Sequence, residues 1–433
     1  MKRIAVFGMG YVGCVTAACL SRDGHSVIGV DIDSAKIASL KAGVPPVAEP
    51  GLPELIAEQV SAGRLTATSD VKHAIRETEM ALIAVGTPSA ADGSVETGAL
   101  ERVVESVGRA LRGGDRPYQV VVRSTLLPGI LETRLAPLLA EAAGCELGAF
   151  ITLCNHPEFL RETTAIRDYD RPPFIIVGAD EPSGAQPVFE LYDRIEAERL
   201  AVDTRTAALV KYACNAFHAL KVGFANEIGT LAREFGADGQ EVMRLLCKDT
   251  RLNISPAYLR PGFAFGGSCL PKDVRALARF AQKQAIDTAL LNAIIPSNEA
   301  HIQRALKRVR EANCRRLGLV GLSFKAGTDD LRESPQVILA ESLLGRGYDL
   351  KIYDPGVHLT RLIGRNLAYV DVHLPHLAAL LVHEPADLFH HAELLILGTD
   401  VANEVNWQTL FGGETIDLRK DLVVAGAPVP VVS

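Results

Sequence analysis

One cysteine of this chain stands among residues that favour a reactive thiolate. Cys269 lies in the segment 266–273, Gly-Gly-Ser-Cys-Leu-Pro-Lys-Asp. The two glycines let the backbone approach a ligand, and Pro271 suits the first turn of a helix. A helix N-terminus and the nearby Lys272 both lower the pKa of a thiol. Asp273, about one helical turn further on, could orient a water or a proton carrier. The segment predicts a cysteine nucleophile.

A dinucleotide fingerprint opens the chain. Gly8, Gly10 and Gly13 follow a short apolar run and enclose Met9, Tyr11 and Val12. The first glycine suits a tight turn, the second lets backbone approach a pyrophosphate, and the third lets helix and strand pack closely. Asp31 ends the next apolar run, where a carboxylate accepts hydrogen bonds from ribose hydroxyls and repels a 2′-phosphate. The fingerprint therefore predicts NAD rather than NADP.

The two features together predict more than either predicts alone. A bound nicotinamide takes up hydride, and a cysteine nucleophile forms a covalent acyl-enzyme. Their pairing indicates the oxidation of an alcohol to an acid, with two hydrides removed.

A long helical stretch carries a second set of polar residues. From 203 to 235 there is no Pro, and apolar residues recur at helical steps, although Gly223 and Gly229 leave a break into two helices possible. Lys211, Asn215 and His218 follow at steps of four and three, on one face. A Lys stabilises a developing alkoxide, and an Asn donates to the same oxygen. The alternatives are a solvated face and, for His218 alone, a surface histidine.

Three strand ends offer further candidates. Glu158 and Glu162 follow one apolar run, and either suits a general base or a ligand of a substrate hydroxyl; helix N-terminal carboxylates are the alternative. Thr87 and Thr125 follow two other runs, where ligands of parallel sheets collect. They are candidates for cofactor or water contacts, or simply turn and cap residues.

The elements that must position these residues form an α/β pattern. Short apolar runs alternate with helical stretches, which predicts a parallel sheet covered on both faces. We expect two Rossmann-like parallel-sheet domains joined by a long central helix and a helical middle domain. The predicted bounds are 1–202 for the NAD-binding domain, 203–309 for the central helix and helical dimerisation domain, and 310–433 for the second Rossmann-like domain, which would bind the sugar nucleotide. Expected strands lie at 3–7, 27–31, 81–85, 120–125, 150–154, 174–177, 317–321, 350–354, 394–398 and 415–418.

Composition narrows the class of protein. The net charge of -7 argues against a broad nucleic-acid-binding surface, because binding to a polyphosphate backbone needs clustered Lys and Arg. The apolar run at the start is short, so we expect a first strand rather than a signal peptide, and no membrane span. The 8 cysteines include no pair at zinc spacing, so no metal site is expected. Seven of them are expected to be inert reduced thiols of a cytoplasmic protein.

These segments together resemble the UDP-glucose/GDP-mannose dehydrogenase family over nearly the whole chain. The resemblance rests on the fingerprint, Gly86-Thr87-Pro88, residues 157–162, Lys211 with Asn215, residues 266–273 and residues 321–335. The segments 252–255 and 258–267 look like the GDP-mannose branch. His156 stands where the family usually has Asn, Ala257 where the mannose enzymes have Tyr, and the tail 423–433 matches nothing recognisable.

The resemblance implies residue roles. NAD would be contacted by Tyr11, Val12, Asp31, Lys36, Thr87, Thr125, Lys272 and Arg332. The nucleotide sugar would be contacted by Glu162, Lys211, Asn215, His218, Asn226, Tyr258 and Arg260, with Lys325 near its phosphates. Cys269 would be the nucleophile.

The same resemblance implies the activity and its setting. The expected reaction is the four-electron oxidation of GDP-mannose at C6 to GDP-mannuronic acid, through a cysteine thiohemiacetal and a thioester. The expected assembly is a homodimer or larger homo-oligomer with shared active sites, serving polysaccharide synthesis of the alginate type. Three alternatives remain: a UDP-glucose 6-dehydrogenase, a two-electron β-hydroxyacid-type dehydrogenase, and a non-catalytic NAD-binding redox sensor switched by Cys269.

Overall fold

The computed structural model describes residues 1–88, 95–148, 150–255, 262–267, 270–324, 328–359, 362 and 364–419. The chain divides into two compact units, Met1–Ala219 and Leu220–Ser433. The predicted three-domain division, with bounds at 202 and 309, stays a prediction. No helix among the described residues combines the length and apolar character needed to cross a bilayer.

The first unit is built on one large sheet. Among the described residues it has eight strands in the order β3-β2-β1-β4-β5-β6-β7-β8. All neighbours pair in parallel except β6 and β7, which meet at one antiparallel pair. The predicted strands are present with bounds shifted by up to three residues, and β3 and β8 were not predicted. The strands are β1 Arg3–Phe7, β2 Ser26–Val30, β3 Leu65–Thr68, β4 Met80–Ile83, β5 Tyr118–Val122, β6 Ile151–Asn155, β7 Phe174–Gly178 and β8 Glu198–Val202.

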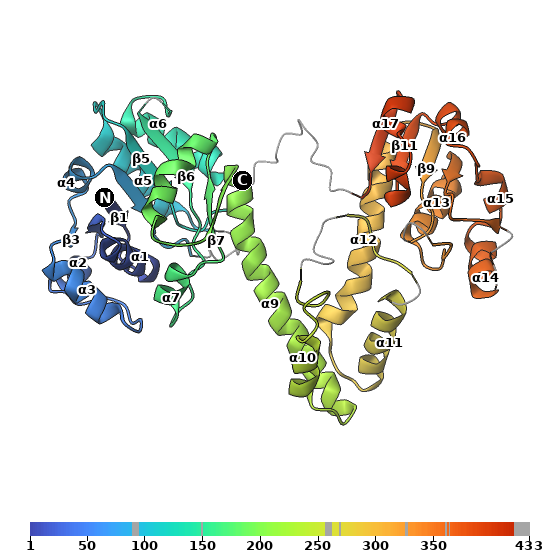
Figure 1. Cartoon of the computed structure of the whole chain (residues 1–433), viewed down its shortest axis with the longest axis horizontal. Coiled ribbons are helices and arrows are strands. Elements are labelled where there is room, and N and C mark those ends of the chain that lie inside the picture. Colours follow the sequence, from blue (N-terminus) through green and yellow to red (C-terminus); the bar gives the residue numbers. More distant parts are fainter. Residues whose placement is uncertain are drawn as a thin grey trace. The chain divides into compact units, whose positions relative to one another are not determined.

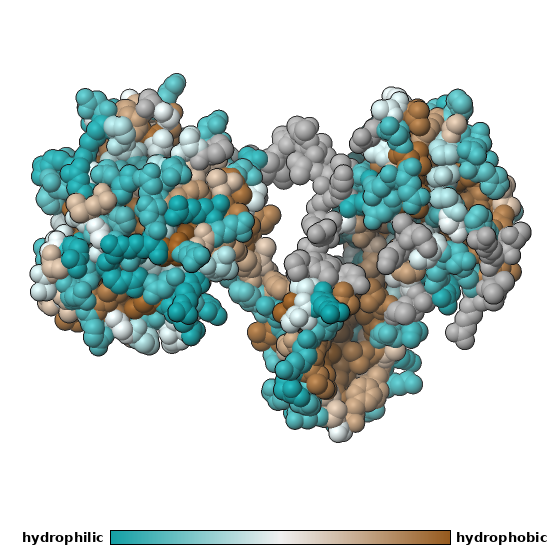
Figure 2. Space-filling view, in the orientation of Figure 1, coloured by the Kyte–Doolittle hydropathy of each residue, from teal (hydrophilic) through white to brown (hydrophobic). Residues whose placement is uncertain are grey.

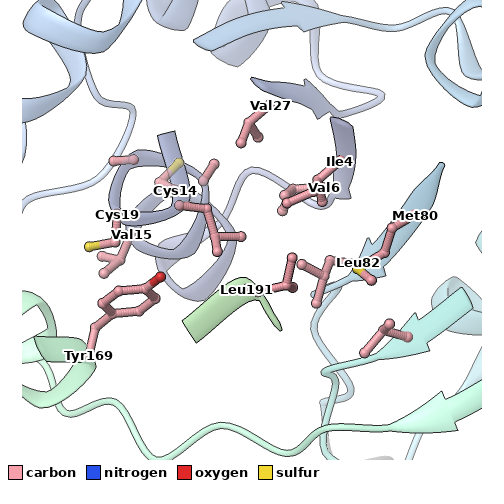
Figure 3. Close-up of a cluster of buried hydrophobic side chains, with 14 of the residues drawn as sticks. Ile4, Val6, Cys14, Val15, Cys19, Val27, Met80, Leu82, Tyr169 and Leu191 are labelled. Atoms are coloured by element: carbon pink, nitrogen blue, oxygen red, sulfur yellow. The ribbon is translucent and has the colours of Figure 1, made fainter. Parts of the chain in front are cut away.

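Helices connect these strands and bury the sheet. Cys14, Val15 and Cys19 of α1 share one buried hydrophobic cluster with Val6 of β1 and Leu82 of β4 (Figure 3). The helical segments of this unit are α1 Tyr11–Arg22, α2 Ser34–Lys41, α3 Leu52–Ser61, α4 Val71–Glu77, α5 Gly98–Leu111, η1 Leu131–Leu135, α6 Ala136–Ala143, α7 Ala165–Asp170, η2 Pro182–Ala185, α8 Gln186–Phe189 and η3 Glu190–Tyr192.

The long predicted helix exists as a single element. α9 runs from Thr204 to Glu234 without a break, so the alternative of two helices is wrong (Figure 1). Its 31 residues extend roughly 46 Å at 1.5 Å per residue. Its glycines are tolerated because packing, rather than propensity, supplies most helical stability.

Between α9 and the second sheet, the described residues form the helices α10 Gly239–Leu246, α11 Leu270–Lys283 and α12 Ala289–Glu311. Leu231, Ala281 and Leu291 form a small buried cluster there. Large apolar side chains nevertheless remain exposed around it, and Figure 2 shows apolar residues gathered over these helices. The exposed ones include Phe235, Val242, Leu245, Leu252, Ile254 and Leu270.

The second sheet is parallel and has the order β10-β9-β11-β12 among the described residues. Its strands are β9 Arg316–Val320, β10 Asp349–Tyr353, β11 Leu394–Leu397 and β12 Glu414–Asp417. Its helical segments are α13 Pro335–Gly345, α14 Gly364–His373, α15 Leu377–Leu380, α16 Pro385–His391, η5 Asp400–Asn403 and α17 Trp407–Leu410. The fold class is therefore as predicted: two Rossmann-like parallel sheets with a long helix and a helical region between them in sequence.

Candidate active site

The glycine turn after β1 is built to leave one open position. Gly8 has φ 92°, a conformation that glycine adopts readily. A Cβ on Gly13 would lie 1.9 Å from the carbonyl oxygen of Gly8, so the two glycines pack against each other. A Cβ on Gly10 would meet no atom within 4 Å. Open space thus lies at the glycine where backbone approaches a pyrophosphate, at the N-terminus of α1, and the residues fit a dinucleotide.

Asp31 lies directly beside this turn. Its Oδ2 accepts a 2.7 Å hydrogen bond from the Met9 amide, and its Oδ1 accepts from the Asp33 amide. The ammonium of Lys36 lies 3.6 Å from Asp31 Oδ2. Each carboxylate oxygen retains a second lone pair, so Asp31 is able both to brace the turn and to receive ribose hydroxyls.

Two neighbouring strand ends are tied together at the same edge of the sheet. Thr87 Oγ1 donates to the carbonyl oxygen of Thr125 at 3.0 Å. Ser124 Oγ donates to the carbonyl oxygen of Val85 at 2.6 Å. The structure therefore brings Thr87 and Thr125 into contact, while their proposed contacts with NAD stay predictions.

A pocket of about 400 Å³ brings the polar face of α9 against the ends of β6 and β7. Lys211, Asn215 and His218 all line it, so the predicted helical constellation is one surface. Cys214 and Asn215 are half-buried or exposed there, whereas Lys211 is only 8% exposed. The solvated-face alternative therefore fails for Lys211. The pocket is also lined by Arg123, His156, Pro157, Phe159, Leu160, Arg161, Asp168, Tyr169, Arg171, Pro172, Pro173, Phe174, Ile175, Ile176 and Tyr192.

Lys211 is held by a carboxylate of the 157–162 segment. Its Nζ donates to Glu158 Oε1 at 3.0 Å, and the two side chains are 10% and 14% exposed. The other oxygen of Glu158 accepts from the Leu160 amide at 2.7 Å. The ammonium also lies 5.4 Å from the ring centroid of Phe159. Since Lys carries three donors, the ammonium keeps others for an oxygen in the pocket.

A buried hydrogen-bond chain supports the floor of this pocket. His156 Nδ1 lies 2.8 Å from the Ile176 carbonyl oxygen, which can only accept, so Nδ1 carries the proton. Nε2 then accepts from the Tyr192 hydroxyl at 2.8 Å, and Tyr192 accepts from Arg123 at 3.3 Å. Burial lowers the pKa of His156 to about 3, with Arg123 adding to the effect. The imidazole is a neutral link at physiological pH.

Glu162 lies outside this pocket lining. It is exposed, and it precedes Thr163, whose φ of 70° is uncommon for a β-branched residue. The amide of Thr163 donates to Glu49 at 2.8 Å. The sequence analysis missed Glu49 because nothing in its spacing links it to residues more than a hundred positions away. Only its place in the turn-like segment Ala48-Glu49-Pro50-Gly51 could have indicated it.

In the second unit, the segment that leads toward Cys269 is tightly held. Asn298 accepts from the Phe265 amide at 2.9 Å and donates to the Phe265 carbonyl oxygen at 2.8 Å. A Cβ on Gly266 would lie 2.2 Å from the Glu333 carbonyl oxygen. Gly267 has φ 85° and a virtual Cβ 3.0 Å from the Phe324 ring. The two glycines thus permit close packing against other parts of the protein, and the approach to a ligand stays a prediction.

Several predicted site residues follow this segment. α11 begins at Leu270, as expected from Pro271. In its first turn Lys272 and Asp273 form a 2.8 Å ion pair with exposed side chains. The guanidinium of Arg332 donates two hydrogen bonds to the carboxylate of Asp330. Asn226 lies on α9, C-terminal to the residues that line the pocket. Cys269, Tyr258, Arg260 and Lys325 lie outside the described residues, so their roles stay predictions.

The second sheet repeats the aspartate arrangement of the first. Asp354 follows β10, is 4% exposed, and accepts from the amides of Leu322 and Ser323. Asp31 accepts from the Met9 amide in the same way. The predicted likeness of the two Rossmann-like domains therefore extends to the hydrogen bonds between this aspartate and the backbone amides of the turn after the first strand of each sheet.

The remaining cysteines mostly suit an inert role. Burial raises the pKa of Cys14, Cys19 and Cys154 to about 12. Cys247, in contrast, is exposed at the C-terminal end of α10.

Comparison with known proteins shows the family. The NAD binding domain, central domain and UDP binding domain of the UDP-glucose/GDP-mannose dehydrogenase family match residues 2–196, 205–300 and 318–411. The chain is 45% identical to the GDP-mannose 6-dehydrogenase of Pseudomonas savastanoi pv. phaseolicola, over 92% of this chain and 90% of that one. It is 37% identical to a UDP-glucose 6-dehydrogenase of Haloferax volcanii, over 81% and 83%.

A solved structure has the same architecture throughout. The ternary complex of GDP-mannose dehydrogenase from Pseudomonas aeruginosa superposes with a TM-score of 0.91, at 43% identity, over 96% of each chain. The chain therefore belongs to the UDP-glucose/GDP-mannose dehydrogenase family, and it is an NAD-dependent nucleotide-sugar dehydrogenase.

Proposed function

We propose that the protein oxidises GDP-mannose at C6 to GDP-mannuronic acid, removing two hydrides from each sugar. The observation that carries this proposal is the Lys211–Glu158 pair beside Asn215 in one pocket of the sheet that bears the dinucleotide fingerprint. The choice of sugar and base is supported by relatives: those named for GDP-mannose are more similar to this chain than the one named for UDP-glucose.

The residues around the cofactor would hold it as follows. Gly8, Gly10, Gly13, Tyr11 and Val12 would cradle the pyrophosphate with backbone amides at the start of α1. Asp31 and Lys36 would bind NAD at its adenine ribose. Thr87 and Thr125 would contact NAD from the ends of β4 and β5. Lys272 and Arg332 would add contacts from the second unit. NAD, when bound, accepts the hydride that leaves C6.

Lys211 and Asn215 would act on the C6 oxygen. The first oxidation removes a hydride from carbon and a proton from the hydroxyl, so negative charge develops on that oxygen. The ammonium of Lys211 and the side-chain amide N–H of Asn215 would stabilise this charge if they already point at the oxygen. Glu158 fixes the ammonium through its 3.0 Å hydrogen bond, which reduces the reorganisation needed during the reaction.

Cys269 would capture the aldehyde. Its thiol adds to the aldehyde carbonyl as a thiohemiacetal. Loss of the second hydride from C6 to a second NAD, and of the hydroxyl proton, leaves a thioester, and water then releases the carboxylate and regenerates the thiol. Covalent capture keeps the aldehyde from escaping and divides a difficult oxidation into easier steps. Asp273, Glu158 or Glu162 would activate the water. Glu162, His218, Asn226, Tyr258, Arg260 and Lys325 would bind the nucleotide sugar.

The exposed apolar side chains around α9 and α10 suit a homodimer or larger homo-oligomer, because soluble monomers rarely leave many large apolar residues uncovered. The product, a nucleotide-activated uronic acid, suits synthesis of an acidic polysaccharide of the alginate type.

Turnover with defined sugars tests this proposal. Purified protein is incubated with NAD and either GDP-mannose or UDP-glucose, and NADH formation is followed. We expect kcat/KM for GDP-mannose to exceed that for UDP-glucose by at least about 100-fold, since a site built for one base rejects another that leaves its polar groups unpaired. A preference for UDP-glucose would contradict the substrate, and no turnover with either would contradict the function.

A further inference from the structure

One buried carboxylate joins the dinucleotide turn to the turn that carries Glu162. Glu49 lies between α2 and α3 and is 5% exposed. Its oxygens accept from the Tyr11 hydroxyl and from the amides of Thr163 and Ala165, both at 2.8 Å. Tyr11 belongs to the glycine fingerprint, whereas Thr163 follows Glu162. Glu49 therefore bonds to both sides of the site at once.

The proton positions in this cluster are determined by chemistry. A carboxylate only accepts, and the two amides only donate. Burial, with the Glu49 carboxylate as a further cause, raises the pKa of Tyr11, so its hydroxyl keeps the proton and donates. The amide of Thr163 also lies 3.2 Å from the Tyr11 oxygen. The Glu49 carboxylate thus accepts from three donors, the Tyr11 hydroxyl and the amides of Thr163 and Ala165.

The turn that Glu49 holds has an unfavourable backbone conformation. Thr163 has φ 70°, in the left-handed region that β-branched residues rarely adopt. Such conformations persist when surrounding bonds determine them. On its other side the turn is held by Asp168, which accepts from the Arg161 amide at 3.0 Å and from Thr164 Oγ1 at 3.0 Å. Between these two supports the Glu162 side chain is exposed.

The same turn borders the pocket of Lys211. Leu160 and Arg161, which lead into Glu162, line that pocket together with Asn215. The conformation at Thr163 therefore decides the direction in which Glu162 leaves the backbone beside the pocket. We propose that Glu49 is a positioning residue, which holds Thr163 in its left-handed conformation and so aims Glu162 at the nucleotide sugar. This inference rests on the role of Glu162 in the proposed function.

Glu49→Gln is the test of this inference. In either orientation the amide nitrogen of Gln would face a backbone N–H, that of Ala165 or that of Thr163, so at least one bond of the cluster is lost with almost no change in volume. We expect the KM for GDP-mannose to rise about 10-fold or more, the size expected from losing a bond to a charged group. The Kd for NAD should stay within about three-fold, because the fingerprint holds the pyrophosphate through its backbone.

Two further variants separate positioning from general stability. Glu393 also accepts two backbone amides, those of Arg315 and Arg316, but lies in the second unit, so Glu393→Gln is the matched control. It should leave the KM for GDP-mannose and the Kd for NAD unchanged. Thr163→Gly added to Glu49→Gln should return the KM for GDP-mannose to within about three-fold of wild type, because glycine adopts φ 70° without the carboxylate.

The outcomes are distinct. An unchanged KM for the sugar in Glu49→Gln, an equal loss toward both ligands, or no recovery with Thr163→Gly would overturn the inference while wild-type turnover stands. Wild-type protein that oxidises neither GDP-mannose nor UDP-glucose would overturn the proposed function, and the inference with it.

Discussion

The ammonium group of Lys211 lies 3.0 Å from Glu158, and both side chains are at least 86% shielded from solvent. An ion pair in such surroundings is sensitive to the loss of one partner, because the other charge then remains buried without compensation. The pair also fixes where the ammonium points. Lys211 is therefore held ready for an oxygen in the pocket that Asn215 shares.

Replacing Glu158 by Gln should lower kcat about 10- to 100-fold, because the neutral amide no longer fixes the ammonium of Lys211. The Kd for NAD should not change. Steady-state kinetics and titration of NAD binding measure the two quantities.

A surface ion pair supplies the control for Glu158. Glu105 pairs with Arg109 on α5 with both side chains exposed, and such pairs contribute little. Glu105→Gln should behave as wild type. If Glu158→Gln kept the wild-type kcat, the alignment of Lys211 would not depend on this pair.

The fingerprint glycines should respond to alanine in opposite ways. Gly10→Ala places a methyl group in open space, so the melting temperature should hold while NAD binding weakens about 10-fold or more, because backbone can no longer approach the phosphates. Gly13→Ala places the methyl 1.9 Å from the Gly8 carbonyl oxygen and should destabilise the fold by about 1–3 kcal/mol. Thermal denaturation and NAD titration separate the two. Equal NAD binding by wild type and Gly10→Ala would contradict the pyrophosphate assignment.

His156 should make the protein sensitive to mild acid. Burial lowers its pKa from 6.5 to about 3, so between these pH values the unfolded chain binds a proton that the folded chain does not. Its contribution to stability is complete above pH 6.5 and is lost as the pH falls toward 3, by up to about 1.4 kcal/mol per pH unit. Thermal unfolding from pH 7 to pH 4.5 measures the slope.

The comparison for His156 uses a second histidine. His156→Gln should reduce the pH slope, whereas His358→Gln, at an exposed imidazole, should not. The buried His25, whose pKa is also lowered by burial, adds to the remaining slope. An unchanged slope in His156→Gln would show that the imidazole does not remain neutral in the fold.

Cys269→Ser should abolish formation of the acid, because serine lacks the thiolate that captures the aldehyde. The variant should keep the wild-type melting temperature and NAD affinity. Product analysis by mass spectrometry detects the uronic acid, and its formation at the wild-type rate would contradict the covalent mechanism.

The strands of the first sheet that the sequence predicts are its interior strands, which pair with a neighbour on each side. Val120 to Val122 of β5 are completely buried and form an unbroken apolar run. The two strands that were missed, β3 and β8, are the edges of the sheet. One side of an edge strand meets solvent, so Glu198 and Arg199 are exposed and interrupt the apolar pattern of β8.

The site could be predicted only where residues lie close in sequence. Lys211, Asn215 and His218 share a helix, so their spacing shows their common face. The partner of Lys211 is 53 positions away, and Glu49 is 114 positions from Thr163. Such pairs depend on how the β-α connections return to one edge of the sheet, which no local pattern contains.

Counting NADH against sugar consumed, with GDP-mannose and excess NAD in a reaction run to completion, distinguishes a four-electron oxidation from a two-electron one. A four-electron oxidation gives two NADH for each GDP-mannose and leaves a uronic acid. One NADH per sugar, with an aldehyde or ketone as the product, would contradict the account and favour a two-electron dehydrogenase.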